Sequence, residues 1–305
     1  MPPAHALFGF LNLNKPSGCS SRDLVNRVQK FVRPLKTGHA GTLDPMATGV
    51  LLVCIGDATR LVSRIQEFPK TYLAEFTLGQ SSDTDDSSGS IRQHPTPAML
   101  PSADEVQTAL KLLTGVITQT PPAYSAVHVA GRRAYELARQ GETPRLQSRE
   151  VTIHHMRLLE YLWPTIRVEI ECSSGTYVRS VARDLGVILG CGGLMSQLER
   201  TAIGAFHVRD SLDSQVLSPT TIHSALISPL EIVAGLSWYG CTETDLDALR
   251  CGKQLPIQAE QLRQTCGALV TGASVALVAD EPPRLCAIAE ISDNQLLQPR
   301  LVFLH

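Results

Sequence analysis

The chain has 305 residues, of which 43% are hydrophobic and 18% are charged, and its formal net charge is −2. These values predict a soluble globular protein of about two domains, and no apolar stretch is long enough to span a bilayer. Eight cysteines form no C-x-x-C pair, which favours reduced thiols over a zinc site or a disulfide framework. Residues 1–6 lack the basic and apolar regions of a signal peptide, so we expect a cytoplasmic protein.

The charge is unevenly distributed along the chain. Residues 1–80 contain nine Lys and Arg against five Asp and Glu, whereas residues 211–305 contain five against ten. The first eighty residues can therefore present a basic face to phosphates, and the net negative charge does not exclude RNA binding.

The first half of the chain alternates predicted strands and helices. Residues 8–14 read as a strand, and Ser20-x-x-Asp23 is a capping-box start for a helix through Val32. Residues 50–55 are an unbroken apolar run, typical of a buried strand, and a short helix is expected over 57–68. Residues 70–78 place Tyr72, Ala74, Phe76 and Leu78 on one side of a strand.

Further along, a helix is expected after Ser102, followed by two strands within 151–172 that break near Trp163-Pro164. Residues 176–189 have helical spacing, with Arg179 and Arg183 on one face. From about residue 238 a short helix and three strands predict a small β-rich unit. We therefore expect two domains, over residues 1–235 and 236–305.

Several classes of chemistry have no marker in the sequence. The phosphate-loop, dinucleotide-binding and G-x-S-x-G motifs are all absent. The adjacent His154 and His155 favour a surface or satisfied core role over metal binding. No metal site is expected.

The stretch from Gly38 to Gly49 carries the most specific signal. It places one carboxylate, Asp44, between glycine-bearing turns and directly before Pro45. The glycines allow close approach of a ligand, and the proline keeps Asp44 out of helical geometry. An acid on a rigid loop beside a core strand is a common position for a catalytic group.

In chain order, this loop and six further segments resemble the pseudouridine synthases of the TruB type, which isomerise the uridine at position 55 in the T-loop of tRNA. The resemblance extends over residues 9–206. The loop resembles the family's G-H-x-G-x-L-D-P-x-A-T-G signature. The other matching segments are Lys15-Pro16-x-Gly18-x-Ser20-Ser21, Asp83-Thr84-x-Asp86, Pro121-Pro122-x-Tyr124-Ser125-Ala126, Tyr135-Glu136-x-Ala138-Arg139-x-Gly141, Gly175-Thr176-Tyr177-x-Arg179 and Asp184-Leu185-Gly186.

The resemblance implies an α+β pseudouridine synthase fold. Its central sheet would be mixed and mostly antiparallel, flanked by helices, and a small β-rich domain resembling a PUA module would follow. It also implies an enzyme that uses no cofactor and no metal, acts on tRNA at the T-loop, and is expected to be monomeric.

The resemblance also implies roles for individual residues. Asp44 would act as nucleophile or as proton acceptor from the sugar, with Arg179 as its ion-pair partner. Tyr72 would stack on the target base and help to remove the C5 proton. His39 would support the flipped-out conformation from the RNA side. The remaining substrate-binding residues implied are Lys15, Gly41, Asp83, Tyr177 and Leu198.

The sequence departs from the family pattern at three positions where a basic residue is usual. These are His128, Ser174 and Glu199, all close to the expected RNA face. The acidic balance of the last part of the chain leads us to expect that the C-terminal unit contributes little to phosphate contact.

Three alternatives remain open from sequence. A non-catalytic RNA-binding or tRNA-folding protein on the same scaffold would be expected to lack the acid, which is present. A sugar hydrolase needs two carboxylates at the glycosidic bond, and no convincing partner for Asp44 is evident. A guide-RNA-dependent relative is disfavoured by the acidic C-terminal part.

Overall fold

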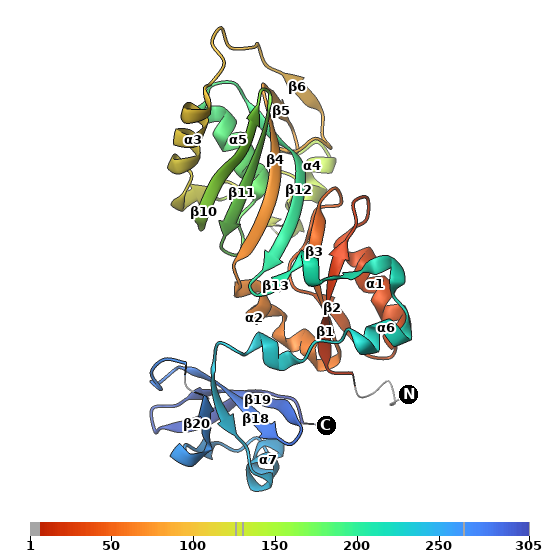
Figure 1. The fold of residues 1–305 in the computed structure, drawn as a ribbon, viewed down its shortest axis with the longest axis vertical. Coiled ribbons are helices and arrows are strands. Elements are labelled where there is room, and N and C mark those ends of the chain that lie inside the picture. The colour runs from red at the N-terminus through yellow and green to blue at the C-terminus, as the bar shows by residue number, and fades with distance from the viewer. Residues whose placement is uncertain (1–6, 126, 130, 265, 305) are drawn as a thin grey trace.

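The structure is a computed structural model that describes residues 7–125, 127–129, 131–264 and 266–304. The predictions for the leader at residues 1–6 and for Ala126 lie outside this part of the chain. Within it, the strands form a ten-stranded sheet and a six-stranded sheet, arranged along the long axis of the molecule (Figure 1). None of the described helices has the length and apolar character needed to span a bilayer.

The larger sheet forms the body of the molecule. Across the sheet, its main strands are β14 (Leu212–Asp213), β1 (Gly9–Lys15), β3 (Thr48–Ile55), β12 (Gly193–Ile203), β4 (Lys70–Leu78), β11 (Thr165–Cys172), β10 (Arg149–Leu162) and β7 (Gly115–Gln119). In addition, β2 (Thr37–His39) pairs with β3, and β13 (Phe206–His207) pairs with β12. Only β1–β14 and β3–β12 are parallel among the described pairs of this sheet. The predicted α+β class, with a mixed and mostly antiparallel sheet, is confirmed.

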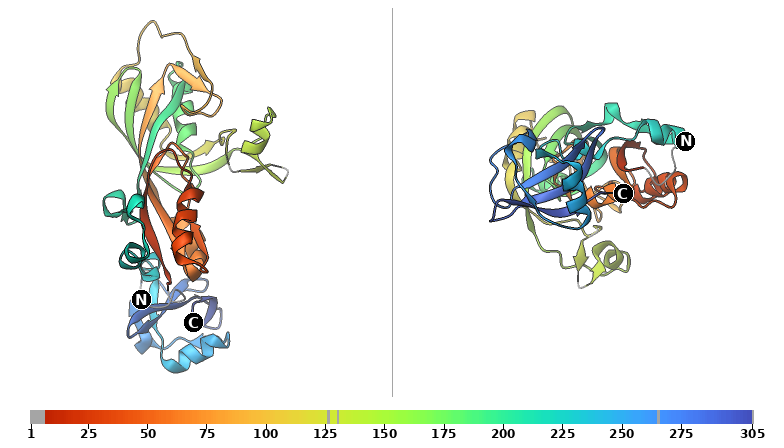
Figure 2. Two further views of the ribbon diagram at one scale, coloured as in Figure 1. Left: turned by 90° about the vertical axis from the view of Figure 1, so that its right-hand side faces the viewer. Right: turned by 90° about the horizontal axis from the view of Figure 1, so that it is seen from below.

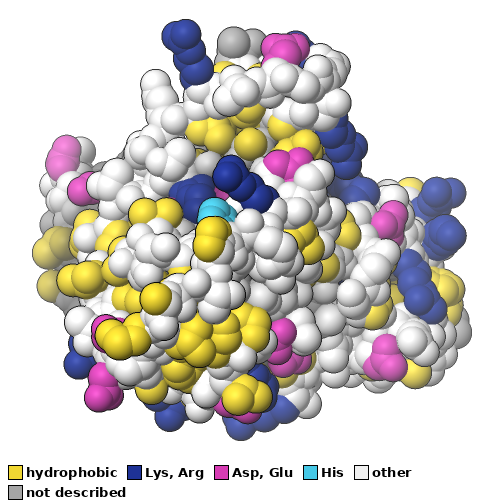
Figure 3. All heavy atoms as spheres, turned by 90° about the horizontal axis from the view of Figure 1, so that it is seen from above, with side chains coloured by type: hydrophobic (Ala, Val, Ile, Leu, Met, Phe, Trp, Pro, Cys, Tyr) yellow, Lys and Arg dark blue, Asp and Glu magenta, His cyan; other side chains and the backbone are white. Residues whose placement is uncertain are grey.

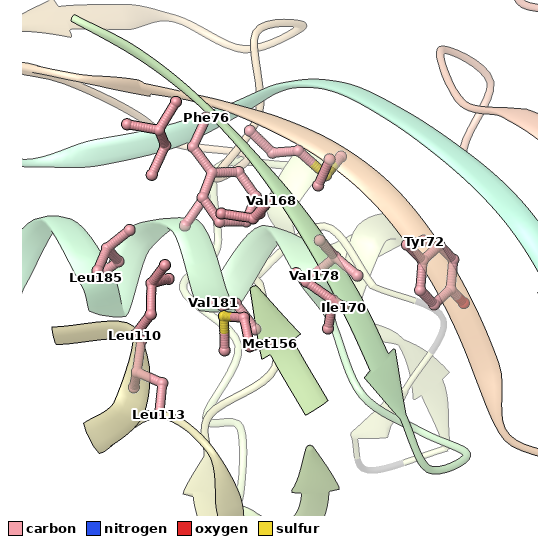
Figure 4. Packing of buried hydrophobic residues seen from close by; sticks show 14 of the residues in the cluster. Tyr72, Phe76, Leu110, Leu113, Met156, Val168, Ile170, Val178, Val181 and Leu185 are labelled. Carbon is pink, nitrogen blue, oxygen red and sulfur yellow. The ribbon is translucent and has the colours of Figure 1, made fainter. Parts of the chain in front are cut away.

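The upper half of this sheet is covered on one face by α5 (Val178–Ile188) and α3 (Ala103–Leu112) (Figure 1). The alternation predicted for β4 is observed, since its even-numbered apolar residues are buried. Figure 4 shows Phe76 of β4, Leu110 of α3 and Val181 of α5 in one packed cluster. Burial of this apolar surface fixes α5, and with it Arg179, against the sheet.

The lower half is built from β1 and β3, with α1 (Ser21–Val32) packed beside them. The predicted capping box is present, because the Ser20 hydroxyl accepts from Asp23 N and the Asp23 carboxylate accepts from Ser20 N. The expected helix over 57–68 is a 3-10 segment, Gly56–Leu61, followed by α2 (Val62–Glu67). Leu24, Val25 and Val28 form the buried face of α1, whereas Phe31 is 39% exposed.

The smaller sheet contains the C-terminal residues. Its strands, in spatial order, are β16 (Leu255–Pro256), β20 (Leu296–Val302), β19 (Pro283–Ile291), β18 (Ser274–Asp280), β15 (Ser237–Gly240) and β17 (Leu262–Gln264), and α7 (Glu243–Arg250) packs on it. The short helix predicted after residue 238 is α7, and β18 begins at Ser274, directly after a turn at residues 271–272.

The two sheets share a hydrophobic cluster. Phe303 stacks on Phe8 with ring centroids 5.1 Å apart, and the Arg60 guanidinium lies 5.1 Å from the Phe303 ring. Arg60 also donates to Val302 O at 2.6 Å. Because the cluster includes residues on both sides of position 235, the division of the chain there stays a prediction.

Residues 127–129 and 131–148 project from the body as a separate arm, drawn in yellow-green (Figure 2). The arm carries β8 (His128–Val129), β9 (Arg132–Arg133) and α4 (Ala134–Arg139), and a loop leads from α4 to the start of β10. A second hairpin, β5 (Gln80–Ser82) with β6 (Ile91–Gln93), encloses the acidic turn at residues 83–90. The remaining helix, α6 (Pro219–Ser224), lies beside α1 (Figure 1).

Candidate active site

Asp44 lies on the loop between β2 and β3, and buried contacts on both sides fix this loop. The Ser21 hydroxyl accepts from Leu43 N at 2.9 Å and donates to Leu43 O at 3.2 Å. The Lys15 ammonium donates to Pro45 O at 3.2 Å. The backbone on either side of Asp44 is therefore held from β1 and α1.

Arg179, one residue into α5, reaches Asp44 across the sheet. Its Nε lies 3.0 Å from Asp44 Oδ2, and its Nη2 donates to Asp44 Oδ1 at 3.3 Å. This two-point contact fixes the plane of the carboxylate as well as its position. The ion pair that the resemblance implied is present in the structure.

The other donors of Arg179 are also occupied. Nη1 lies 3.4 Å from Asp86 Oδ2 and donates to Thr84 O at 3.1 Å, and Nη2 also donates to Tyr124 O at 3.1 Å. The guanidinium is thus shared between two carboxylates and two carbonyls from three segments distant in sequence. Its side chain is 7% exposed, whereas that of Asp44 is 32% exposed, so Asp44 is the member of this cluster that a substrate can reach.

The Asp44 carboxyl has an altered protonation equilibrium. Burial raises its pKa above the usual range, Arg179 lowers it, the nearby Asp86 raises it and Lys15 lowers it. Desolvation is the largest of these effects. A carboxylate that is poorly solvated and held by one guanidinium is a stronger nucleophile and base than one in water.

Tyr72 stands on β4 between Ile170 of β11 and Arg200 of β12. Only 9% of it is exposed, and it lies at one side of the packed apolar cluster to which it belongs (Figure 4). Burial raises the pKa of its hydroxyl, while the positive charge of Arg200 and a hydrogen bond from it oppose this rise.

Lys15 and Asp83, both predicted to bind the substrate, make contacts within the protein instead. Lys15 is fully buried, and its ammonium donates to Pro16 O, Cys19 O and Pro45 O. An ammonium has three protons, so none remains for a substrate, and Lys15 holds the loop instead. Asp83 is exposed and accepts from Ser90 N at 2.7 Å, closing its own turn.

Three other predicted site residues lie on β2, before α5 and on β12. His39 on β2 is partly buried, its Nδ1 has no hydrogen-bond partner among the described residues, and burial, Arg22 and Arg200 lower its pKa. Tyr177 precedes α5, and the Arg149 guanidinium lies 5.1 Å from its ring centroid. Leu198 of β12 is 8% exposed and belongs to the same apolar cluster as Tyr72.

Two residues of the site were not identified as functional from the sequence. Asp86 was visible only as one of several acids in a motif, and the turn at Asp85, with φ of 60°, directs Asp86 towards Arg179. Arg200 is 1% exposed, and its guanidinium donates to Gly41 O and Val50 O. An isolated Arg in a strand gives no sequence signal for such a role.

The projecting arm is rich in basic residues. Residues 127–148 of the sequence contain four Arg and two Glu. Figure 3, which views the end of the molecule that carries α3 and α5, shows Lys, Arg and His side chains around acidic ones near the middle of this face. Such a surface suits a phosphate backbone.

Comparison with known proteins identifies the family. Residues 29–178 match the N-terminal domain of the TruB family pseudouridylate synthases. The chain is 40% identical over 303 residues to tRNA pseudouridine synthase B of Microcystis aeruginosa, covering 97% of this chain and 99% of that one. It is 38% identical over 288 residues to the protein of that name from Mycobacterium bovis, covering 92% and 95%.

Solved structures agree on the fold. A chain in an H/ACA RNP bound to a substrate RNA containing 2′-deoxyuridine has a TM-score of 0.74 at 22% identity, covering 99% of this chain and 86% of that one. A chain in a Cbf5-Nop10-Gar1 complex has a TM-score of 0.74 at 23% identity, covering 98% and 86%. Since 40% identity extends over almost the whole of this chain and of its relative, the protein belongs to the TruB family of pseudouridylate synthases.

Proposed function

We propose that this protein isomerises uridine 55 in the T-loop of tRNA to pseudouridine, without a cofactor. The names of its relatives support tRNA as the substrate. The observation that carries the proposal is the two-point contact between Arg179 and Asp44, because it presents one oriented, accessible carboxylate, whose charge also acts on the hydroxyl of Tyr72.

The reaction needs one carboxylate and no redox agent. The N1–C1′ bond of the uridine breaks, the uracil turns, and C5 bonds to C1′, while C5 loses its proton and N1 gains one. Asp44 either attacks C1′ or accepts a proton from the sugar to start this sequence. Arg179 keeps the carboxylate ionised and oriented for either route.

Tyr72 is the proposed partner of the uracil. Its ring offers a stacking surface beside Asp44, and its hydroxyl is the proposed acceptor that helps to remove the C5 proton. The uridine must leave the RNA stack to reach these groups, as other base-modifying enzymes require. His39, Gly41, Tyr177 and Leu198 are the proposed contacts of the flipped nucleotide and of the loop that it leaves.

The roles proposed for Lys15 and Asp83 change with their positions. Lys15 is assigned to holding Pro45 and thereby Asp44, rather than to binding RNA. Asp83 is assigned to closing the turn that presents Asp86 to Arg179.

The rival hydrolase reading would need a second carboxylic acid beside Asp44. Asp86 is the neighbouring acid, but its side chain is 5% exposed and its Oδ1 accepts from Thr84 Oγ1, Ser88 N and Ser88 Oγ. A carboxylate held by so many donors is a poor general acid. We also propose that the protein is monomeric and cytoplasmic, as expected from the sequence.

Incubation with an unmodified tRNA transcript, followed by mapping of pseudouridine, tests the proposal. We expect pseudouridine at position 55, and none in a transcript with cytidine there. Product at another position alone, or at none, would overturn the assignment.

A further inference from the structure

Arg200 is the largest fully buried side chain among the described residues, and it carries a charge. It forms no ion pair with any carboxylate in the described part of the chain. Its acceptors are the neutral carbonyls of Val50, at 2.8 Å from Nε, and Gly41, at 3.2 Å from Nη2. Burying a charge against neutral acceptors is costly, so stability alone gives little reason for this arrangement.

The two acceptors bracket the catalytic loop. Gly41 lies three residues before Asp44 and Val50 six residues after it, so one rigid guanidinium joins both ends of the segment that carries the acid. Gly41 has φ of 110°, and an added Cβ would lie 3.6 Å from Arg200 Nη1. The loop backbone therefore passes directly over this side chain.

The backbone of Arg200 is also fixed relative to the same loop. Arg200 pairs with Gly49 in the parallel contact of β12 with β3. Gly49 has φ of 101°, and an added Cβ would lie 2.2 Å from Arg200 O. This close approach leaves no space for the strand to shift against the loop.

On its other side, Arg200 pairs with Tyr72 in the antiparallel contact of β12 with β4. Side chains of directly opposed residues lie on one face of a sheet, and the positive charge of Arg200 opposes the rise that burial causes in the pKa of the Tyr72 hydroxyl. One residue thus holds both ends of the Asp44 loop and is the direct cross-strand neighbour of the aromatic residue proposed to face the base.

We infer that Arg200 is a positioning residue that sets the distance between Asp44 and Tyr72, because its guanidinium holds both ends of the Asp44 loop while its strand pairs it directly with Tyr72. This inference rests on the proposed function, since it concerns the geometry of the two proposed catalytic groups. Arg200 acts through these groups and does not itself touch the uridine.

The test compares Arg200→Lys and Arg200→Met with the parent protein in single-turnover pseudouridine formation and in tRNA binding. A displacement of about 1 Å in a catalytic group costs roughly a hundredfold in rate, so we expect a loss of that order for Arg200→Met with unchanged tRNA affinity. Arg200→Lys should recover part of the rate, because an ammonium restores the charge and some contacts but not the planar fork.

If Arg200 only stabilised the fold, its substitution would not be energetically coupled to a substitution of Tyr72. In a double-mutant cycle with Tyr72→Phe, we expect the two losses to be clearly non-additive, because Arg200 and Tyr72 are direct cross-strand neighbours. Arg167→Lys and Arg167→Met serve as matched controls, since Arg167 lies exposed on β11 of the same sheet, and they should leave the rate unchanged.

Two outcomes would overturn the inference. One is a parental single-turnover rate in Arg200→Met, or in Arg200→Lys if the methionine variant does not fold. The other is additive losses with Tyr72→Phe. The proposed function fails separately, if the parent protein forms no pseudouridine at position 55.

Discussion

The guanidinium of Arg179 and the carboxylate of Asp44 meet through two atoms on each side, at 3.0 Å and 3.3 Å. Arg179 lies on a helix packed in the core, whereas the side chain of Asp44 is about a third exposed. The pair therefore joins a rigid element to a group that a substrate can reach. The orientation of the carboxylate thus depends on packing across the sheet.

Replacement of Arg179 by Lys should lower the single-turnover rate about a hundredfold or more, because an ammonium cannot hold both carboxylate oxygens in one plane. Binding of tRNA should change little, since Arg179 is buried. Arg183→Lys is the matched control one turn along the same helix, where Arg183 pairs with Asp85 at 2.8 Å, and a much smaller loss is expected there. Equal losses in both variants would contradict the role given to Arg179.

Titration of Asp44 should make activity rise with pH and the free energy of unfolding fall with pH. Burial raises the pKa of this carboxyl, so activity should rise with pH through an inflection above the usual 3.8. Between the unfolded and folded pKa values, the folded state binds more protons than the unfolded chain, so the free energy of unfolding should fall as pH rises.

This stability term is measured by urea unfolding of the parent and of Asp44→Asn across the acid range. The difference in unfolding free energy between the two proteins isolates the contribution of the carboxyl group. A difference that rises with pH would mean that the folded pKa is lowered, in conflict with the dominant role given to burial.

Affinity for tRNA should depend on the projecting arm and little on the C-terminal unit. Loss of Arg139 and Arg145 to Ala should weaken binding and reduce the slope of log Kd against log salt by about one for each lost phosphate contact. Both side chains are exposed on the arm.

The matched control uses the C-terminal unit. Its Arg250, Arg263 and Arg300 are paired with Asp247, Asp280 and Glu290. The exposed Lys253 and Arg284 are the control positions. If the C-terminal unit makes few phosphate contacts, replacing both by Ala should leave the affinity for tRNA and the salt slope unchanged. A larger effect from these two than from the arm would reverse the assignment of the RNA face.

Phe303 should stabilise the contact between the two sheets. It is 3% exposed, stacks on Phe8 and lies under Arg60. Phe303→Ala should lower the free energy of unfolding by about 3 kcal/mol or more, measured by urea denaturation. Val270→Ala, at a side chain 57% exposed in the same unit, should change it by less than about 0.5 kcal/mol. Similar values for the two would show that the shared cluster contributes little.

Local patterns predicted those elements whose burial follows a simple period. The alternation of β4 and the capping boxes at Ser20 and Ser102 are properties of short segments, and they are observed. The central strand β12 was not predicted, because bulges at Met195/Gln197 and Arg200/Ala202 break its alternation. Its partners are also far away in sequence, which no local pattern records.

The site divides in the same way. The Asp44 loop could be singled out from its own glycines and proline, but the pairing of Asp44 with Arg179 was implied only by the family resemblance. The choice of Asp86 rather than Asp83 as the second carboxylate depends on a turn in three dimensions. The role of Arg200 depends on three strands meeting at one guanidinium.

The most direct measurement of the central claim uses a tRNA transcript carrying tritium at C5 of its uridines, because joining C5 to C1′ releases that hydrogen. The parent protein should release tritium equivalent to one uridine per tRNA, whereas Asp44→Asn should release none while binding the same transcript with similar affinity. Tritium release by Asp44→Asn at the parental rate would contradict the account, since the carboxylate of Asp44 would then not be required.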